Sequence, residues 1–241
     1  RAVASLEHAC HARGLLVSSA KTLVQTLEEA EKDVGKESKD FAEYLLQADA
    51  ARGMVALRRI FAGAVPASGP IDVSDAKFAL WRLARRLDGR VMNRLLARLD
   101  DLGPVASVSA VYLRQFLSRP RVVDAITDFL HDPERNTSDY LECWLFAAML
   151  EFPRTPPDPW VSRARVVAHD RNRSNAHRVL AMNLLALGRR ASDIASLKRA
   201  ASLDRDQDVA RGALVALHRV SKLDASTQAA ARTRHPDLAK T

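Results

Sequence analysis

The clearest evidence for the fold is the segment SVSAVYLRQFLSRPRVVDAITDFLH, residues 107–131. It divides into two amphipathic parts, residues 107–117 and 120–131, in which apolar residues return at helical spacing. Pro120 is well suited to the first turn of the second helix, because that turn needs no amide donor. The break between the two parts is so short that the predicted helices must form an antiparallel hairpin.

The same pattern continues on both sides of this hairpin. Further helices are predicted at residues 41–61, 74–86, 89–102, 137–152, 160–169, 175–187, 192–202 and 208–222, and the tail is expected to fray after Ala231. A helix pair returns about every 30–35 residues, a period typical of helical-repeat proteins. Such pairs bury their apolar faces only by stacking, so the sequence predicts an all-α fold of antiparallel helix pairs stacked as an α-solenoid. Within it, residues 206–217 resemble the second half of a HEAT-type repeat.

The composition is that of a folded protein with a basic surface. Apolar residues make up 47% and charged residues 27% of the chain, which excludes disorder as the main state. The net charge of +8 permits an acidic partner such as nucleic acid. However, the 37 basic residues are 29 Arg and 8 Lys, a bias that a GC-rich coding sequence produces on its own.

Several features bear on where the chain belongs. No apolar segment is long enough to span a bilayer, so we expect no membrane association. Cys10 and Cys143 are too few for a disulfide framework, which favours a reducing cytoplasm. The first residue is Arg1, without an initiator Met, which predicts that the chain is a piece of a longer protein. The clearest linker is GAVPASGP at residues 63–70, where we place a domain boundary.

The most informative motif is LEHACHARGLLVSSAKT, residues 6–22. A predicted helix ends at Gly14-Leu15, a short apolar segment follows, and Lys21-Thr22 comes next. This order resembles the segment just past the catalytic Asp-Asp strand in reverse transcriptases, especially the bacterial retron-like and phage-defence kinds. Several of those enzymes carry a helical-repeat extension in place of a usual thumb, and residues 80–87 and 111–117 look like parts of it.

The resemblance implies three regions and a role for one lysine. Residues 1–36 would end a polymerase palm, residues 37–62 would form a connecting helix, and residues 71–235 would be the helical-repeat domain. Lys21 would match the lysine at the palm edge, where it contacts the triphosphate or helps to protonate the leaving pyrophosphate. The parent enzyme would use Mg²⁺, but this chain has no Tyr-x-Asp-Asp or Phe-x-Asp-Asp box and is not expected to be catalytic by itself.

An arginine stripe is the second candidate site. Arg90, Arg94 and Arg98 are spaced at i, i+4 and i+8, so they share one face of the predicted helix at 89–102. Arg82 and Arg86 on the preceding helix, with Arg85, would extend this surface toward a phosphate backbone. The alternative is a solvated face paired with the three nearby aspartates, Asp88, Asp100 and Asp101.

Other groups are weaker candidates. A looser basic cluster surrounds a predicted helix–helix turn and consists of Arg163, Arg165, His169, Arg171, Arg173 and Arg178. His8, Cys10 and His11 suggest a metal only weakly, because no fourth ligand has a suitable spacing, so no metal site is predicted. Trp81, Trp144 and Trp160 are spaced as core anchors of separate helices, and base stacking by any of them is the less favoured interpretation.

Two functions therefore remain open from the sequence. The first is the C-terminal helical-repeat region of a reverse transcriptase-like protein, an RNA-directed DNA polymerase, that binds nucleic acid or a partner protein. The second is a non-enzymatic HEAT-like scaffold whose concave face mediates protein–protein interaction.

Overall fold

The computed structural model describes residues 39–132 and 138–239. All regular structure within them is helical, with twelve α-helices and four short 3₁₀ segments. The chain divides into two compact units, Arg1–Gly53 and Met54–Thr241. The boundary between them lies within α4, and the linker predicted at residues 63–70 lies in the second unit. The predictions for residues before 39, including Lys21 and the palm-like region at 1–36, concern residues outside the described ones.

The helices follow one another with short connections. The α-helices are α3 Lys39–Ala48, α4 Ala50–Ala64, α5 Val73–Arg85, α6 Met92–Leu96, α7 Ala106–Arg114, α8 Pro120–His131, α9 Asp139–Met149, α10 Asp158–His169, α11 Asn175–Gly188, α12 Ala191–Leu203, α13 Gln207–Arg219 and α14 Ala225–Arg234. The 3₁₀ segments are η1 Gly89–Val91, η2 Leu99–Asp101, η3 Gly103–Val105 and η4 Pro236–Ala239.

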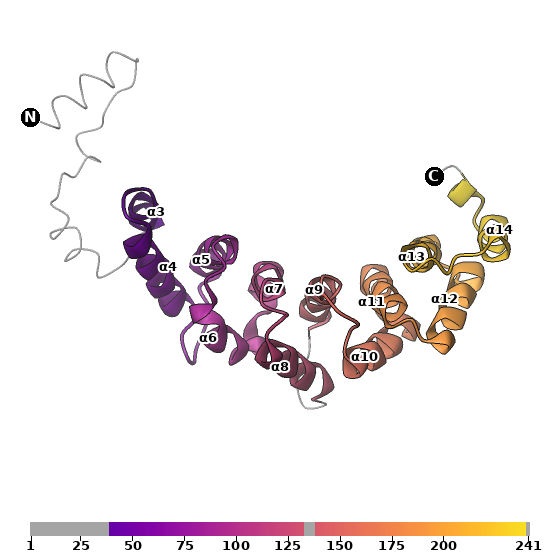
Figure 1. Cartoon of the computed structure of the whole chain (residues 1–241), viewed down its shortest axis with the longest axis horizontal. Helices are drawn as coiled ribbons and strands as arrows, with labels where there is room; N and C mark the ends of the chain where they lie inside the picture. Colours follow the sequence, from indigo (N-terminus) through magenta and orange to yellow (C-terminus); the bar gives the residue numbers. More distant parts are fainter. Residues whose placement is uncertain (1–38, 133–137, 240–241) are drawn as a thin grey trace, which may run out of the picture. The chain divides into compact units, whose positions relative to one another are not determined.

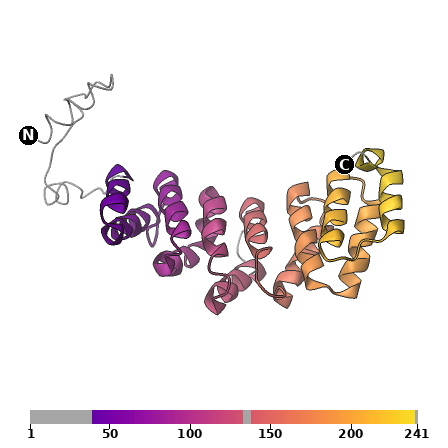
Figure 2. The same cartoon turned by 45° about the horizontal axis from the view of Figure 1, so that its top comes forward.

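The second unit is built from two rows of helices. In one row, α5, α7, α9, α11 and α13 pack side by side in sequence order (Figure 1). In the other row, α6 packs on α8, α8 on α10, and α12 on α14. The rows are joined where α10 packs on α11 and α12 on α13, and Figure 2 shows the same succession of neighbours from another side. The all-helical fold predicted from the sequence is therefore confirmed, with helices that pack on others one or two places away in the chain.

Polar residues mark where several helices begin. The carboxylates of Asp72 and Asp206 accept hydrogen bonds from amides in the first turns of α5 and α13, at 3.0 Å from Asp75 N and 2.9 Å from Asp208 N. Ser174 caps α11 and Asp224 caps α14 in the same way. These caps satisfy amides that have no partner within the helix. Pro120 occupies the first turn of α8, as predicted.

The core is mostly aliphatic, as the low aromatic content implies. Two of the largest buried side chains carry a polar atom that is hydrogen-bonded. The hydroxyl of Tyr112 donates to the Asp88 carbonyl at 2.7 Å, and the indole of Trp160 donates to Thr127 Oγ1 at 2.8 Å. Both bonds join neighbouring helices or turns, so they fix the packing as well as satisfying buried donors.

Three predicted elements differ from the structure. The helix expected at 89–102 is three short pieces, η1, α6 and η2, because the Asp88 carboxylate caps a tight turn at Arg90 N and the backbone then changes between 3₁₀ and α geometry. The helix expected at 41–61 is divided at Asp49, whose carboxylate caps the start of α4 through Ala51 N at 3.0 Å. The tail expected to fray after Ala231 forms α14 to Arg234 and then η4.

The stability of the last elements has a clear source. Ala210, Ala231 and Leu238 form a small buried cluster against which Leu214 packs. Within the described residues, no helix is both long and apolar enough to cross a membrane.

Candidate functional site

The predicted arginine stripe is not a continuous surface. Arg98 is buried, and its guanidinium donates to the carbonyls of Pro66 and Gly69, the latter at 2.7 Å, and to Asp101 Oδ2 at 2.7 Å. It therefore holds the segment around residues 66–69 against the end of α6. Assigning Arg98 to a solvated phosphate-binding face was wrong, because the helix expected at 89–102 breaks into short pieces and turns this side chain inward.

The other members of the stripe reach solvent in different ways. Arg94 is exposed and donates from Nη1 to the Ala62 carbonyl at 3.0 Å. Arg90 and Arg86 are exposed, whereas Arg82 is half-buried with its guanidinium 3.8 Å from the centre of the Phe78 ring. Four of the five predicted residues thus have guanidinium groups at or near the surface, but they do not form one helical stripe.

Trp81 also lies in a different environment from the one expected. It was expected to anchor the core, but 45% of its surface is exposed, while Trp160 is fully buried and Trp144 is intermediate. The guanidinium carbon of Arg85 lies 4.7 Å from the centre of the Trp81 ring, and that of Arg82 lies 5.7 Å from it. The size of the ring alone suggested burial, although Lys77 and Arg85, one turn before and one turn after it on α5, are exposed as well.

These side chains define a patch on α5. We call Lys77, Trp81, Arg82, Arg85 and Arg86 the α5 basic patch; four of the five are exposed and Arg82 is half-buried. Three cations on α5 and a fourth at its C-cap, Arg86, accompany one exposed aromatic ring. The combination of basic groups with a solvent-facing ring is the chemistry used by proteins that bind single-stranded nucleic acid, where the cations contact phosphates and the ring stacks on a base.

Some residues of the second basic cluster form ion pairs between helices, and the others line a pocket. Arg165 makes two hydrogen bonds to Asp193, at 2.8 and 2.9 Å, and so joins α10 to α12. The pKa of Arg165 is raised, because its hydrogen bond to Asp193 outweighs burial, which lowers the pKa. Arg163 and Arg173 instead bind acidic groups on α9, which leaves His169, Arg171 and Arg178 near one another.

A buried polar group joins α9, α10 and α11. Glu142 is fully buried, and both its oxygens accept from Arg163, at 2.5 and 3.2 Å. Arg173 reaches Asp139 and lies 3.7 Å from Glu142 Oε2. His177 is also fully buried with Nε2 3.4 Å from the same carboxylate. Burial lowers the pKa of His177; the charges of Glu142 and Asp139 oppose this and those of Arg173 and Arg163 add to it, so the ring is neutral at neutral pH.

This group also has the composition of a metal site. Asp139, Glu142 and His177 each offer one ligand atom, and these atoms lie within 4.8 Å of one another. However, the two guanidinium groups already place positive charge against the two carboxylates. The charge of the carboxylates is balanced without a metal ion, so we interpret the group as a structural connection between helices.

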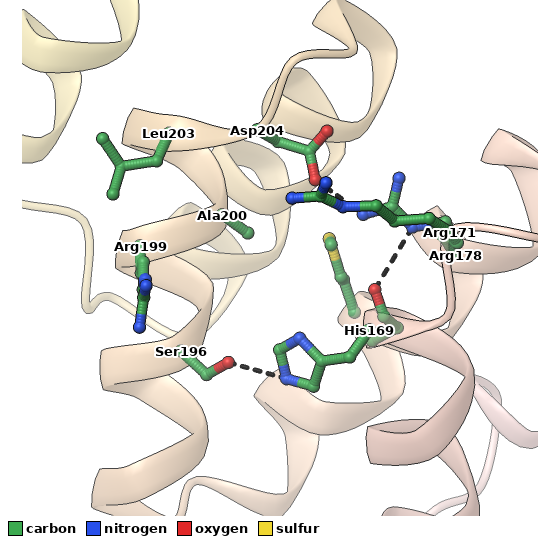
Figure 3. Close-up of a pocket in the computed structure, with 10 residues that line it drawn as sticks. His169, Arg171, Arg178, Ser196, Arg199, Ala200, Leu203 and Asp204 are labelled. Carbon is green, nitrogen blue, oxygen red and sulfur yellow. Dashed lines mark hydrogen bonds and ion pairs between the residues drawn. The ribbon is translucent and has the colours of Figure 1, made fainter.

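A cavity lies beside α12. It has a volume of about 270 Å³ and opens between the end of α10, the start of α11 and α12 (Figure 3). Its polar lining comprises His169, Arg171, Arg178, Ser196, Arg199 and Asp204, and its apolar lining comprises Ala168, Met182, Ala200 and Leu203. Figure 3 shows Arg199 on one side of the cavity, Arg171 and Arg178 on the other, and His169 with Ser196 between them. The sequence indicated three of these polar residues but not Ser196, Arg199 or Asp204, which come from an element about 25 residues further along the chain.

Hydrogen bonds fix one wall of this cavity. Arg178 is buried and donates to Asp204 Oδ2 at 2.6 Å and to the Ala168 carbonyl at 3.3 Å. Burial works to raise the pKa of Asp204, but hydrogen bonds from the Asp206 amide and Arg178, with the charges of Arg178 and Arg171, lower it overall. Asp204 is therefore ionised at neutral pH. His169 Nε2 lies 2.8 Å from Ser196 Oγ, which positions the opposite side.

Comparison with known proteins adds no assignment. No family model, curated protein or solved structure matches the chain.

Proposed function

We propose that this chain is the C-terminal, helical-repeat part of a reverse transcriptase-like protein and that it binds single-stranded nucleic acid. The repeat would be a HEAT-like α-solenoid, without catalytic activity of its own. The observation that carries the binding function is the α5 basic patch, in which the guanidinium groups of Arg82 and Arg85 lie beside the exposed Trp81 ring. Lys77 and Arg86 add two exposed cations on the neighbouring turns. The polymerase part of the proposal is supported by the resemblance at residues 6–22 and not by the geometry of the described residues.

The patch is suited to a single strand for two reasons. Its cations lie on successive turns of α5, where they can contact successive phosphates. These contacts give affinity without sequence preference. Trp81 presents an aromatic face that an unpaired base can stack on, and this contact contributes about 1–3 kcal/mol per base in proteins of this kind. Bases in a duplex are already stacked, so a duplex would gain the phosphate contacts only.

The proposal is tested by binding of a labelled single-stranded 20-nucleotide DNA or RNA, measured by fluorescence anisotropy. Trp81→Ala should weaken binding by about 1–3 kcal/mol, the usual contribution of one stacked base. Arg85→Gln with Arg86→Gln should weaken it too and should flatten the plot of log affinity against log salt, by about 0.7 per lost phosphate contact. Duplex binding should be weaker than strand binding and insensitive to Trp81→Ala.

The control keeps the change in net charge constant. Arg211→Gln with Arg232→Gln removes two exposed cations from α13 and α14, helices that do not pack on α5. If the α5 variants bind like this control, the patch is a solvated face and the proposal is wrong. The polymerase part is tested separately by the residues encoded before Arg1, where an Asp-Asp box within a few tens of positions is required.

A protein-binding scaffold is the second candidate. It is favoured by Tyr140 on α9 and Val215 on α13, which expose 57% and 54% of their surfaces on the row of helices that also carries Trp81. Exposed apolar side chains on one row can dock another protein. Strand binding that does not depend on the α5 basic patch would favour this function.

A further inference from the structure

The cavity beside α12 has no role in the proposed function. It is formed by residues from α10, α11, α12 and the turn that follows α12, and none of them belongs to the α5 basic patch. Its lining combines three kinds of surface in about 270 Å³: arginine cations, one ionised carboxylate and an apolar wall. This volume is just below the range for small-molecule pockets, which is roughly 300–1,000 Å³, so the ligand must be small.

The three arginines of the cavity are held in different ways. Arg178 is held by Asp204 and the Ala168 carbonyl, so its charge is largely neutralised. Among the described residues, Arg171 and Arg199 are exposed and make no hydrogen bond or ion pair with an acidic side chain. Three arginines against one aspartate leave the pocket with an excess of positive charge. The pocket is therefore suited to an anionic group, and guanidinium groups favour phosphate in particular.

The other residues that line the pocket indicate which further groups the ligand carries. The oxygens of Asp204 accept from Asp206 N at 3.0 Å and from Arg178, and each keeps a lone pair for a donor on the ligand. Met182, Ala200 and Leu203 supply an apolar wall against which a flat ring can pack. Ser196 and His169 add a hydroxyl and an imidazole next to Arg199 (Figure 3). A ligand that fits all of these carries a phosphate, hydrogen-bond donors and an aromatic body.

The wall that carries Asp204 is rigidly held. Its carbonyl accepts from Arg234 Nε at 2.9 Å and lies 3.0 Å from His235 Nε2, so the end of α14 fixes the turn after α12. Arg178, which lines the base of the cavity, is more than nine-tenths buried. The pocket is thus largely formed before a ligand binds, which lowers the entropic cost of binding.

From this arrangement we infer that the pocket binds a terminal nucleoside phosphate. Arg171 and Arg199 contact the phosphate, Asp204 accepts from the sugar hydroxyls or the base, and the apolar wall packs against the base. Two sources carry this chemistry, a free nucleoside monophosphate and the 5′-phosphorylated end of a strand. The inference concerns a site separate from the α5 basic patch, so either one can fail without the other.

Calorimetric titration of the whole chain with AMP, GMP, CMP and UMP tests the inference. At least one should bind, while adenosine and guanosine bind at least about tenfold more weakly because they lack the charge-assisted hydrogen bonds to arginine. Arg171→Gln with Arg199→Gln should weaken nucleotide binding by about tenfold or more. Arg211→Gln with Arg232→Gln, which changes the net charge equally, should leave it unchanged.

Two further arms separate the sources of the ligand. A strand with a 5′-phosphate that binds more tightly than the same strand with a 5′-hydroxyl, and loses this preference in the Arg171/Arg199 variant, identifies a strand end. Equal binding of both strands together with AMP or GMP binding identifies a free nucleotide. Absence of binding by all four nucleotides with equal binding of the two strands overturns the inference. Nucleotide binding that the Arg171/Arg199 variant retains in full also overturns it. Circular dichroism of the variant and the parent shows whether a loss of binding comes from unfolding instead.

Discussion

The arginines of this chain have two kinds of environment. Arg98, Arg163, Arg165 and Arg178 each donate to carboxylates or carbonyls of another segment, and these contacts link elements that are between about 10 and 30 residues apart. Arg85, Arg86, Arg171 and Arg199 instead extend to solvent. A planar guanidinium with five donors suits the first environment because it can join several acceptors at once. The basic composition is therefore partly a means of holding helices together, and net charge alone overstates the surface available to an acidic partner.

Arg98 allows this distinction to be measured. Arg98→Gln should lower the free energy of unfolding by about 2 kcal/mol, because charge-assisted hydrogen bonds to the carbonyls of Pro66 and Gly69 and to Asp101 are lost. Arg94→Gln is the matched control: it removes a single exposed bond to Ala62 and should cost well under about 1 kcal/mol. Urea denaturation of both variants gives the two values. Equal stability of the two variants would mean that Arg98 does not anchor the segment at residues 66–69.

The same residues show what sequence patterns can and cannot give. The spacing of Arg90, Arg94 and Arg98 indicates one face only if residues 89–102 form one helix, and a short cap at Asp88 prevents that. The partners of Arg98 are carbonyls about 30 positions away, which no local pattern reveals. Trp81 was misplaced for a related reason, since its burial depends on whether a neighbouring helix covers that side of α5.

At the scale of helices, close approach between neighbours is set by small residues. A Cβ placed on Gly212 of α13 would lie 2.6 Å from Val179 Cγ2 and 2.8 Å from its Cγ1, on the neighbouring α11. Glycine normally weakens the middle of a helix by about 0.5–1 kcal/mol relative to alanine. Here the absence of a side chain lets α11 and α13 pack directly, so the usual preference is reversed.

Gly212→Ala should therefore destabilise the protein although alanine favours a helix. We expect a loss of about 1–3 kcal/mol in the free energy of unfolding, the usual cost of excess volume in a packed core. Val179→Ala with Gly212→Ala should recover part of this loss, because the methyl groups that clash are then absent. Thermal denaturation of the two single variants and the double variant forms a double-mutant cycle. A Gly212→Ala variant that is more stable than the parent would contradict the packing described for α11 and α13.

Helix positions were the most predictable part of the fold. The predicted helix at 120–131 matches α8, and that at 175–187 ends one residue before α11 does. Strong apolar periodicity, a proline at the first turn and a glycine near the end fix such boundaries locally. The elements that were missed, α14 and the division at Asp49, depend on weak apolar patterns, and α14 acquires its stability from Ala210 and Leu238 packed around Ala231.

Across the second unit, each helix is stabilised chiefly by helices one or two places away in the chain. The contacts run from α5 to α7, to α9, to α11 and to α13, and the second row is joined to the first mainly by α10 with α11 and α12 with α13. The proposed binding sites lie at different places in this series: the α5 basic patch is near one end and the pocket beside α12 is toward the other. Stability in such an array is approximately a sum of local terms, so distant parts open independently.

Hydrogen exchange by mass spectrometry can test this independence with the two variants already described. Gly212→Ala disturbs the packing of α11 on α13, so exchange should accelerate in α11–α14 and remain close to the parent in α5 and α7. Arg98→Gln removes the contacts that hold the segment at residues 66–69, so exchange should accelerate in α5, α6 and α7 and change little in α12–α14. The two variants thus serve as controls for each other, and circular dichroism should show that both remain helical. If either variant accelerates exchange by the same factor in all of these helices, the unit unfolds as one cooperative body. The pocket beside α12 would then be energetically coupled to the α5 basic patch, because destabilising either site would weaken both.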